Sequence, residues 1–165
     1  MIKIFPIKLN DVNDIWINWL NDKIVTKYSI QRKKKHTLKS QVLFLKKKLN
    51  DKNCKLFKIL YNEKFVGVIE LKNIDKINNC AELSYMIGER ELWGIGLGTK
   101  SVDLILKYAK KKLKLNKVIS SIMSVNKASK KVLTKNKFKK YGEIKNFYYF
   151  QNKHVSKIFF IKYLK

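Results

Sequence analysis

The stretch ELWGIGLGTK, residues 91–100, carries three of the chain's six glycines at alternate positions, 94, 96 and 98. An apolar segment, residues 81–87, precedes it and an amphipathic segment, residues 98–113, follows it. The first N–H groups of a helix, together with the positive end of its dipole, form an anion site. Glycine removes the side chains that would keep a phosphate away from these donors. The stretch therefore predicts a pyrophosphate-binding loop that leads from a strand into a helix.

Three other interpretations of the glycines agree with their spacing to different degrees. A dinucleotide fingerprint requires G-x-G-x-x-G, and Thr99 and Lys100 break that spacing. A Walker loop requires G-x-x-x-x-G-K-[ST], and the interval from Gly94 to Lys100 is wrong for it. A flexible turn without a ligand remains open when this stretch is considered alone.

Length and composition indicate a single folded domain covering residues 1–165. The chain is 45% hydrophobic and 12% aromatic, which is enough apolar material for a core without disulfide or metal staples. The formal net charge is +26, and arginine occurs only at Arg32 and Arg90. A lysine surface of this kind arises from coding bias, or it attracts an acidic partner such as a phosphate-bearing small molecule.

The cysteines and the N-terminal segment bear on the compartment. Cys54 and Cys80 have no metal-ligand spacing, and we expect reduced, buried thiols and no bound metal. The start, MIKIFPIKLNDVNDIW, has an acidic turn where a signal peptide needs a continuous apolar core. We expect a cytoplasmic protein with no membrane partner.

The apolar periodicity changes repeatedly between that of strands and that of helices. It predicts strands at residues 2–9, 55–61, 65–71, 80–88, 117–123, 147–150 and 154–164, and helices at 11–22, 38–49, 98–113 and 127–136. Pro6 indicates an edge strand, and Thr37 is a good N-cap for the second helix. Val42, Leu43 and the run from Leu45 to Leu49 are expected to form the core stripe of that helix. The order β-α-α-β-β-β-α-β-α-β-β predicts an α/β fold with a mixed sheet and helices on its faces.

The central segment, AELSYMIGERELWGIGLGTKSV, resembles the cofactor motif of the GCN5-related N-acetyltransferase (GNAT) superfamily. Trp93 occupies the place where glutamine or arginine is usual, as in the branch of the ribosomal-protein alanine acetyltransferases and certain amino-sugar acetyltransferases. The segment NKASKKVLTKNKF, residues 126–138, is similar to the same branch, although Lys137 replaces its usual glycine. The upstream segment, residues 14–45, also matches this branch, so the resemblance covers nearly the whole chain.

The resemblance implies a single GNAT-like domain with a mostly antiparallel sheet of six or seven strands. It also implies a split between two central strands, about four flanking helices, and acetyl-CoA as co-substrate. A splayed strand leaves backbone groups that pair with the pantetheine arm, and the glycine loop holds the pyrophosphate. The expected cofactor-binding residues are Tyr85, Met86, Ile87, Trp93, Gly94, Ile95, Gly96, Leu97, Gly98, Thr99 and Asn126. Asn126 can also serve as the N-cap of the helix that follows it.

The reaction in this family is direct attack of an amine on a thioester, which requires a neutral amine and a protonated leaving group. Glu82 is the candidate base, and its alternative role is that of a strand carboxylate paired with lysine. Ser129 occupies the position where this branch has a serine near the leaving thiolate. The commoner acid of the family is a tyrosine, and this chain has Leu133 there. Tyr148 or Tyr149 could compensate, or these aromatics belong to the core or the acceptor pocket.

The acceptor is expected to be a small-molecule amine that carries phosphate. Arg32 could bind its phosphate, and His36 could serve as a base or hydrogen-bond partner. Trp19, Tyr28 and Tyr148 could form an apolar or sugar-stacking wall. A nucleotide-linked amino sugar of bacterial surface-glycan synthesis is favoured, with a protein N-terminus as the alternative. A non-catalytic module that binds nucleic acid is a remote alternative, nucleic acid is otherwise not expected as a partner, and a homodimer is compatible with the sequence.

Overall fold

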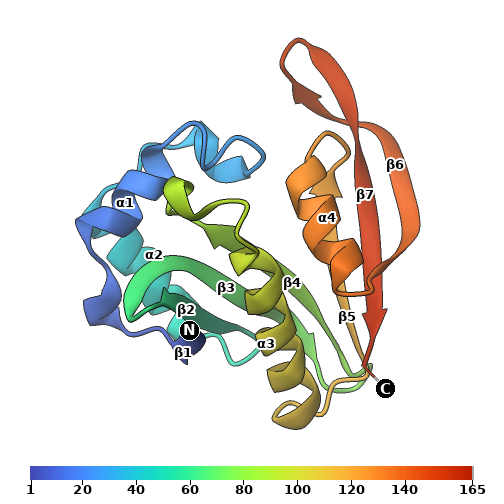
Figure 1. The fold of residues 1–165 in the computed structure, drawn as a ribbon, viewed down its shortest axis with the longest axis horizontal. Coiled ribbons are helices and arrows are strands. Elements are labelled where there is room, and N and C mark those ends of the chain that lie inside the picture. The colour runs from blue at the N-terminus through green and yellow to red at the C-terminus, as the bar shows by residue number, and fades with distance from the viewer. Residues whose placement is uncertain (165) are drawn as a thin grey trace.

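The chain forms a seven-stranded mixed sheet with the order β1-β2-β3-β4-β5-β7-β6, seen in the computed structural model, which describes residues 1–164 (Figure 1). The strands are β1 (Ile2–Pro6), β2 (Lys55–Tyr61), β3 (Lys64–Asp75), β4 (Cys80–Ile87), β5 (Lys117–Met123), β6 (Lys139–Phe150) and β7 (Lys153–Tyr163). The helices are α1 (Asp14–Asn21), α2 (Leu38–Asn50), α3 (Leu97–Lys111) and α4 (Lys127–Lys135). Three short 3-10 turns are η1 (Leu9–Asp11), η2 (Ile30–Lys33) and η3 (Arg90–Leu92). The predicted element order, the mixed sheet and the four helices are confirmed.

The sheet is split between β4 and β5. These strands are parallel and pair over three positions, from Cys80 opposite Lys117 to Glu82 opposite Ile119. Beyond Glu82 the two strands diverge in Figure 1, and β4 continues to pair with β3 alone in the part of the chain that is described. The other strand pairs are antiparallel, so the expected split lies at the one parallel junction between described strands.

Helices cover both faces of the first half of the sheet. The larger core cluster joins the apolar side of α3 to β2, β3, β4 and β5, and a second cluster joins α1 and α2 to β2 and β3. Successive strand residues point to opposite faces, so Ile69 of β3 belongs to the first cluster and its neighbour Val68 packs against the second. In Figure 1, α3 and α4 both lie in front of the strands.

The helix starts follow their capping residues. Asn13 accepts a hydrogen bond from the Trp16 amide at the start of α1, and Thr37 accepts one from Ser40 in a capping box at the start of α2. The second cap confirms the prediction for Thr37.

The core stripe predicted for α2 is wrong in part. Leu43 is 59% exposed and Leu49 is 46% exposed, whereas Gln41 and Leu45 are the buried residues. Residues two apart on a helix point in nearly opposite directions, so a helix that buries Leu45 must expose Leu43. Leu49 lies at the last turn of the helix.

The two cysteines are free, with Cys54 buried and Cys80 partly exposed. The expectation of buried thiols is therefore confirmed for Cys54 only. None of the helices in residues 1–164 has the length and hydropathy that crossing a membrane requires.

Candidate active site

The N-terminus of α3 is open to solvent on its glycine side. Gly94 and Gly96 have φ angles of 87° and 91°, and a Cβ added at either position would meet no atom within 4 Å. Such φ values are strained for other residues, which explains both glycines. The Lys100 amide bonds to the Gly96 carbonyl at 3.1 Å, and the amides before it are the first N–H groups of the helix, which have no acceptor within it. The geometry provides an electropositive edge with unobstructed access.

Gly98 has a packing role that the sequence did not predict. A Cβ there would lie 3.3 Å from Cγ2 of Val132 on α4 and 3.7 Å from the Tyr85 ring. Gly98 therefore permits close packing of α3 against α4, and its contact with a phosphate stays a prediction.

Trp93 closes the end of β4. Its indole Nε1 donates to the Ile87 carbonyl at 2.9 Å, and its backbone N–H donates to the Arg90 carbonyl at 3.0 Å. Both groups are engaged within the chain, so the amides available to an anion begin at Gly94 rather than at Trp93. The Ile87 carbonyl, expected to be open to the cofactor, is also engaged.

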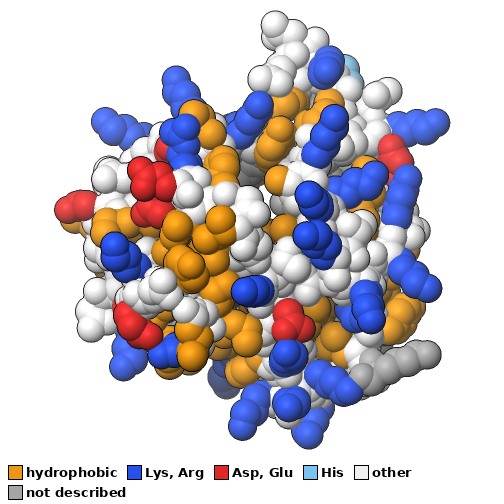
Figure 2. Space-filling model, viewed as in Figure 1, with side chains coloured by type: hydrophobic (Ala, Val, Ile, Leu, Met, Phe, Trp, Pro, Cys, Tyr) orange, Lys and Arg blue, Asp and Glu red, His pale blue; other side chains and the backbone are white. Residues whose placement is uncertain are grey.

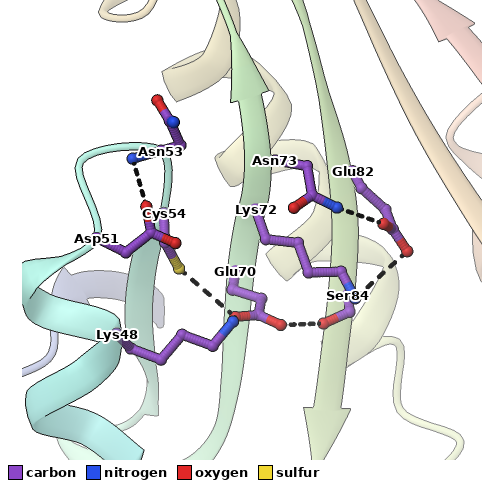
Figure 3. Close-up of polar contacts among 9 residues, drawn as sticks. All are labelled: Lys48, Asp51, Asn53, Cys54, Glu70, Lys72, Asn73, Glu82 and Ser84. Carbon is purple, nitrogen blue, oxygen red and sulfur yellow. Dashed lines mark hydrogen bonds and ion pairs between the residues drawn. The ribbon is translucent and has the colours of Figure 1, made fainter.

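Glu82 lies where the pairing of β4 with β5 ends. Its Oε1 is 3.3 Å from Nζ of Lys72, and its Oε2 accepts a hydrogen bond from Asn73 at 3.2 Å (Figure 3). The Glu82 side chain is 28% exposed, so solvent reaches it. The charge of Glu82, after burial, raises the pKa of Tyr148, which places this β6 residue near the carboxylate. Glu82 thus forms the lysine pair of its alternative role, and its role as the catalytic base stays a prediction.

Ser129 and Tyr85 lie near each other on the other face of the sheet, where the buried Tyr85 hydroxyl has no hydrogen-bond partner among the described residues. Asn126 caps α4, with its Oδ1 accepting the Ser129 amide at 3.1 Å. Burial raises the pKa of Tyr85 to about 12, and contact with the Ser129 side chain opposes this rise. Because side chains alternate along a strand, Tyr85 and Glu82 point to opposite faces. Leu133, at the position of the family's tyrosine, is buried.

Met86 of β4 points to the face that carries Glu82. Its side chain packs against the α1 cluster that contains Trp16 and Trp19. Any contribution of Met86 to cofactor binding therefore comes from its backbone.

Three of the predicted acceptor residues come together around Phe150. The Tyr28 ring lies 5.5 Å from the Phe150 ring, and the Arg32 guanidinium lies over the same ring at 5.5 Å. Arg32 also donates to the Ser29 carbonyl at 2.9 Å. Tyr148 packs against the same cluster, so the segment between α1 and α2 meets the β6–β7 hairpin at these side chains. The sequence predicts Phe150 only as a strand residue. The cluster of aromatic residues in FYYF, residues 147–150, is the sequence feature that could have indicated its place in the pocket.

The other two predicted acceptor residues hold the local structure. Trp19 is 6% exposed, and a Cβ on Gly88 would lie 1.9 Å from its ring. Trp19 therefore packs directly on the backbone of Gly88, beside a hollow of about 550 Å³. His36 is tied to Gln31 through Nε2 at 3.1 Å, and its backbone exchanges two hydrogen bonds with Asn21. These contacts give Trp19 and His36 roles in the core and in the loop.

The sequence of residues 2–139 matches the family model described as the acetyltransferase (GNAT) domain. The chain belongs to the GNAT family. GNAT enzymes use acetyl-CoA as co-substrate, and the open edge at Gly94 and Gly96 fits its diphosphate. The splayed edge of β4 fits the amide groups of its pantetheine arm.

Two curated GNAT relatives match part of the chain. The chain is 28% identical over 102 residues to YdaF of Bacillus subtilis, which is named as a ribosomal N-acetyltransferase. The aligned segment covers 62% of this chain and 55% of YdaF. Over 106 residues the chain is 31% identical to the acetyltransferase PseH of Campylobacter jejuni, which covers 64% of each chain. The chain therefore spans less than two thirds of the length of these relatives.

Solved structures support the fold. The spermidine N-acetyltransferase of Vibrio cholerae, in complex with CoA and spermine, has a TM-score of 0.89 at 16% identity, covering 99% of this chain and 95% of that one. A GNAT acetyltransferase from Streptococcus pneumoniae has a TM-score of 0.79 at 17% identity, covering all of both chains. At these identities the likeness concerns the fold alone.

Proposed function

We propose that this chain transfers the acetyl group of acetyl-CoA to a primary amine. The observation that carries this proposal is the position of Glu82. It lies at the last position of β4 that pairs with β5, where the split opens toward the glycine-edged start of α3. A carboxylate at the split can take a proton from an amine near the place where a thioester would lie.

The two faces of the split suit two different proton transfers. Bound acetyl-CoA supplies the activated acyl group. Glu82, held by Lys72 and Asn73, accepts the proton that an ammonium must lose before it can attack. Ser129, in contact with Tyr85 on the opposite face, carries the hydroxyl that can donate to the leaving sulfur.

Cys54 does not suit a covalent route. Burial and the charge of Glu70 raise the pKa of its thiol to about 11, so the thiol stays protonated near neutral pH. Cys54 therefore supplies no thiolate for a covalent intermediate, and the proposed route is direct transfer to the amine.

A nucleotide-linked amino sugar is the acceptor that we favour. The net charge of +26 attracts an acidic substrate, and Arg32 offers a guanidinium for a phosphate. Phe150, Tyr28 and Tyr148 offer aromatic faces for a sugar or base beside it.

A protein N-terminus is the second candidate, and one surface feature favours it. A groove of about 730 Å³ between α3, α4 and β7 is lined by six lysines, with Asp103 as the acidic residue among its lining. Figure 2 shows lysine side chains distributed over the same face of the molecule. Such a groove suits a partner rich in phosphate, such as a ribosome, and YdaF is named as a ribosomal N-acetyltransferase. The lysines lining the groove are Lys107, Lys110, Lys135, Lys137, Lys139 and Lys162.

Polyamines are unfavourable acceptors for this chain, although the Vibrio cholerae neighbour was crystallised with spermine. A protein with a net charge of +26 repels a polycation and slows its approach.

The experiment that tests the proposed function is CoA release from acetyl-CoA by the purified chain, across a panel of acceptors. The panel contains nucleotide-linked amino sugars, the same sugars without the nucleotide, peptides with free N-termini, and spermidine. We expect turnover on the nucleotide-linked sugars that exceeds turnover on the free sugars. Turnover confined to peptides would select the second candidate, and turnover confined to spermidine would contradict the charge argument. Silence on all acceptors would contradict the proposal.

A further inference from the structure

A serine of β4 shares a hydrogen bond with a carboxylate of β3 on the face of the sheet that carries Glu82. Ser84 Oγ donates to Oε1 of Glu70 at 2.8 Å (Figure 3). In the antiparallel register Ser84 lies opposite Glu70, and Glu82 lies opposite Lys72. These four side chains therefore form two adjacent cross-strand pairs on one face.

Glu70 is fixed from its other side by α2. Nζ of Lys48 lies 2.9 Å from Oε2 of Glu70, and their side chains are 21% and 14% exposed. Burial would lower the pKa of Lys48, but the hydrogen bond to Glu70 and the Glu70 charge outweigh it and raise this pKa. Cys54 Sγ lies 3.7 Å from the same carboxylate. Lys48 therefore holds the Glu70 carboxylate in place as a hydrogen-bond acceptor.

This arrangement determines what Ser84 can offer to a ligand. A serine hydroxyl has one hydrogen and two lone pairs. The hydrogen is committed to the Glu70 carboxylate, so the group that remains available is an acceptor of hydrogen bonds. Ser84 is half-buried and lies beyond Glu82, on the part of β4 that has diverged from β5. In Figure 3 the Lys72 side chain extends to the carboxylate of Glu82.

A neutral primary amine has two N–H groups and one lone pair. If Glu82 takes the proton of the ammonium, the amine must still be oriented so that its lone pair faces the thioester. A hydrogen-bond acceptor two residues further along the same face of the strand can bind one of the remaining N–H groups of the amine. A secondary amine, once neutral, has a single N–H group and cannot satisfy Glu82 and Ser84 together.

We propose that Ser84, oriented by Glu70, binds an N–H group of the acceptor and selects primary over secondary amines. Ser84 is the specificity residue that touches the acceptor, and Glu70 is a positioning residue that acts through it. This inference rests on the proposed function, because it needs an amine acceptor at the split.

The test compares Ser84→Ala, Ser84→Thr and Glu70→Gln with the wild type on the best acceptor of the panel and on its N-methyl derivative. Ser84→Ala should raise the KM of the primary amine about tenfold, the value expected for one lost hydrogen bond. It should lower the preference for the primary amine over the N-methyl amine by at least a similar factor. The affinity for acetyl-CoA and the shape of the pH profile should stay unchanged.

Ser84→Thr keeps the hydroxyl and suits a strand, so it should restore most of the preference. Glu70→Gln should act in the same direction as Ser84→Ala, and the double variant should lose little more than either single variant.

The matched control is another partly buried ion pair, Lys58 with Asp11 at 2.6 Å, whose side chains are 25% and 16% exposed. Asp11→Asn should lower the melting temperature to an extent similar to Glu70→Gln and leave the amine preference intact.

Two results would overturn the inference. An active enzyme in which Ser84→Ala changes neither the acceptor KM nor the amine preference would refute it, while the proposed function would stand. A wild-type chain that acetylates no amine would overturn both.

Discussion

The ammonium of Lys72 lies 3.3 Å from the carboxylate of Glu82, at the register position where β4 stops pairing with β5. An ion pair at this place holds the Glu82 carboxylate at the split, where it can accept the proton of an amine. Glu82→Gln should therefore lower turnover by about 100-fold, a typical contribution of one general base. The loss should be largest at acidic pH, because at alkaline pH the solvent already deprotonates the acceptor.

The measurement is the pH profile of kcat/KM for Glu82→Gln and the wild type. Glu63→Gln removes an exposed carboxylate in the turn between β2 and β3 that pairs with Lys3 at 2.7 Å, and its profile should match the wild type. A Glu82→Gln profile parallel to that of the wild type would exclude Glu82 as the base.

Substitutions at Gly96 test whether the diphosphate of acetyl-CoA binds at the start of α3. Gly96→Ala introduces strain at a φ of 91°, at a cost of about 1 kcal/mol, but leaves the amides accessible. Gly96→Asp adds a negative charge there and should weaken acetyl-CoA binding at least about 100-fold by calorimetry. Gly142→Ala is the control, because its new Cβ would meet Phe159 at an ordinary 3.8 Å. Equal acetyl-CoA affinities of the alanine and aspartate variants would place the diphosphate elsewhere.

Gly98 tests the packing role that the structure gives it. Gly98→Ala places a Cβ 3.3 Å from Cγ2 of Val132, and this crowding should cancel part of the about 1 kcal/mol that alanine normally adds to a helix. Adding Val132→Ala should relieve the crowding, so that the double variant is more stable than the sum of the single effects predicts. Urea unfolding of the four proteins measures this. Strict additivity would show that Gly98 and Val132 do not crowd one another.

The sequence predicted elements better than side-chain contacts. Element order followed from the periodicity, and the split followed from the family motif around AELSYMIG. The exposure of Leu43 did not, because an apolar run on a helix does not reveal which arc faces the sheet. The pairing of Glu70 with Ser84 could not be predicted either, since their 2.8 Å hydrogen bond depends on a cross-strand register that no local pattern encodes.

The acceptor residues show the same limit. Tyr28 and Arg32 are far in sequence from Phe150, and only the fold brings them to one ring. Trp19 and His36 have the right residue types for a pocket, but the Trp19 ring packs on Gly88 and the His36 imidazole contacts the Gln31 carbonyl.

Arg32 should matter for phosphate-bearing acceptors in particular. Arg32→Ala should raise the KM for a nucleotide-linked sugar about tenfold and leave the KM for the free sugar nearly unchanged. Arg32→Lys keeps the charge but loses the bidentate donor geometry. Its KM for the nucleotide-linked sugar should therefore lie between those of the wild type and Arg32→Ala. Equal effects on both acceptors would mean that Arg32 supports the Phe150 cluster only.

Cys54 provides a test of the Glu70 site that needs no substrate. Burial, followed by the Glu70 charge, raises the pKa of its thiol from 9.0 to about 11. Iodoacetamide should therefore modify Cys80 well before Cys54 in the folded chain, as read by mass spectrometry. The unfolded chain loses this proton first as the pH rises, so the contribution of Cys54 to stability should fall between pH 9 and about 11. Rapid alkylation of Cys54 in the native protein would contradict its burial beside Glu70.

The most direct test of the central claim, that acetyl-CoA binds at the split and the start of α3, is amide hydrogen exchange with and without acetyl-CoA. Binding should slow exchange at residues 94–99 and along the free edge of β4, and leave the lysine groove between α3, α4 and β7 unchanged. Protection confined to another part of the chain, or no protection at saturating acetyl-CoA, would contradict the claim.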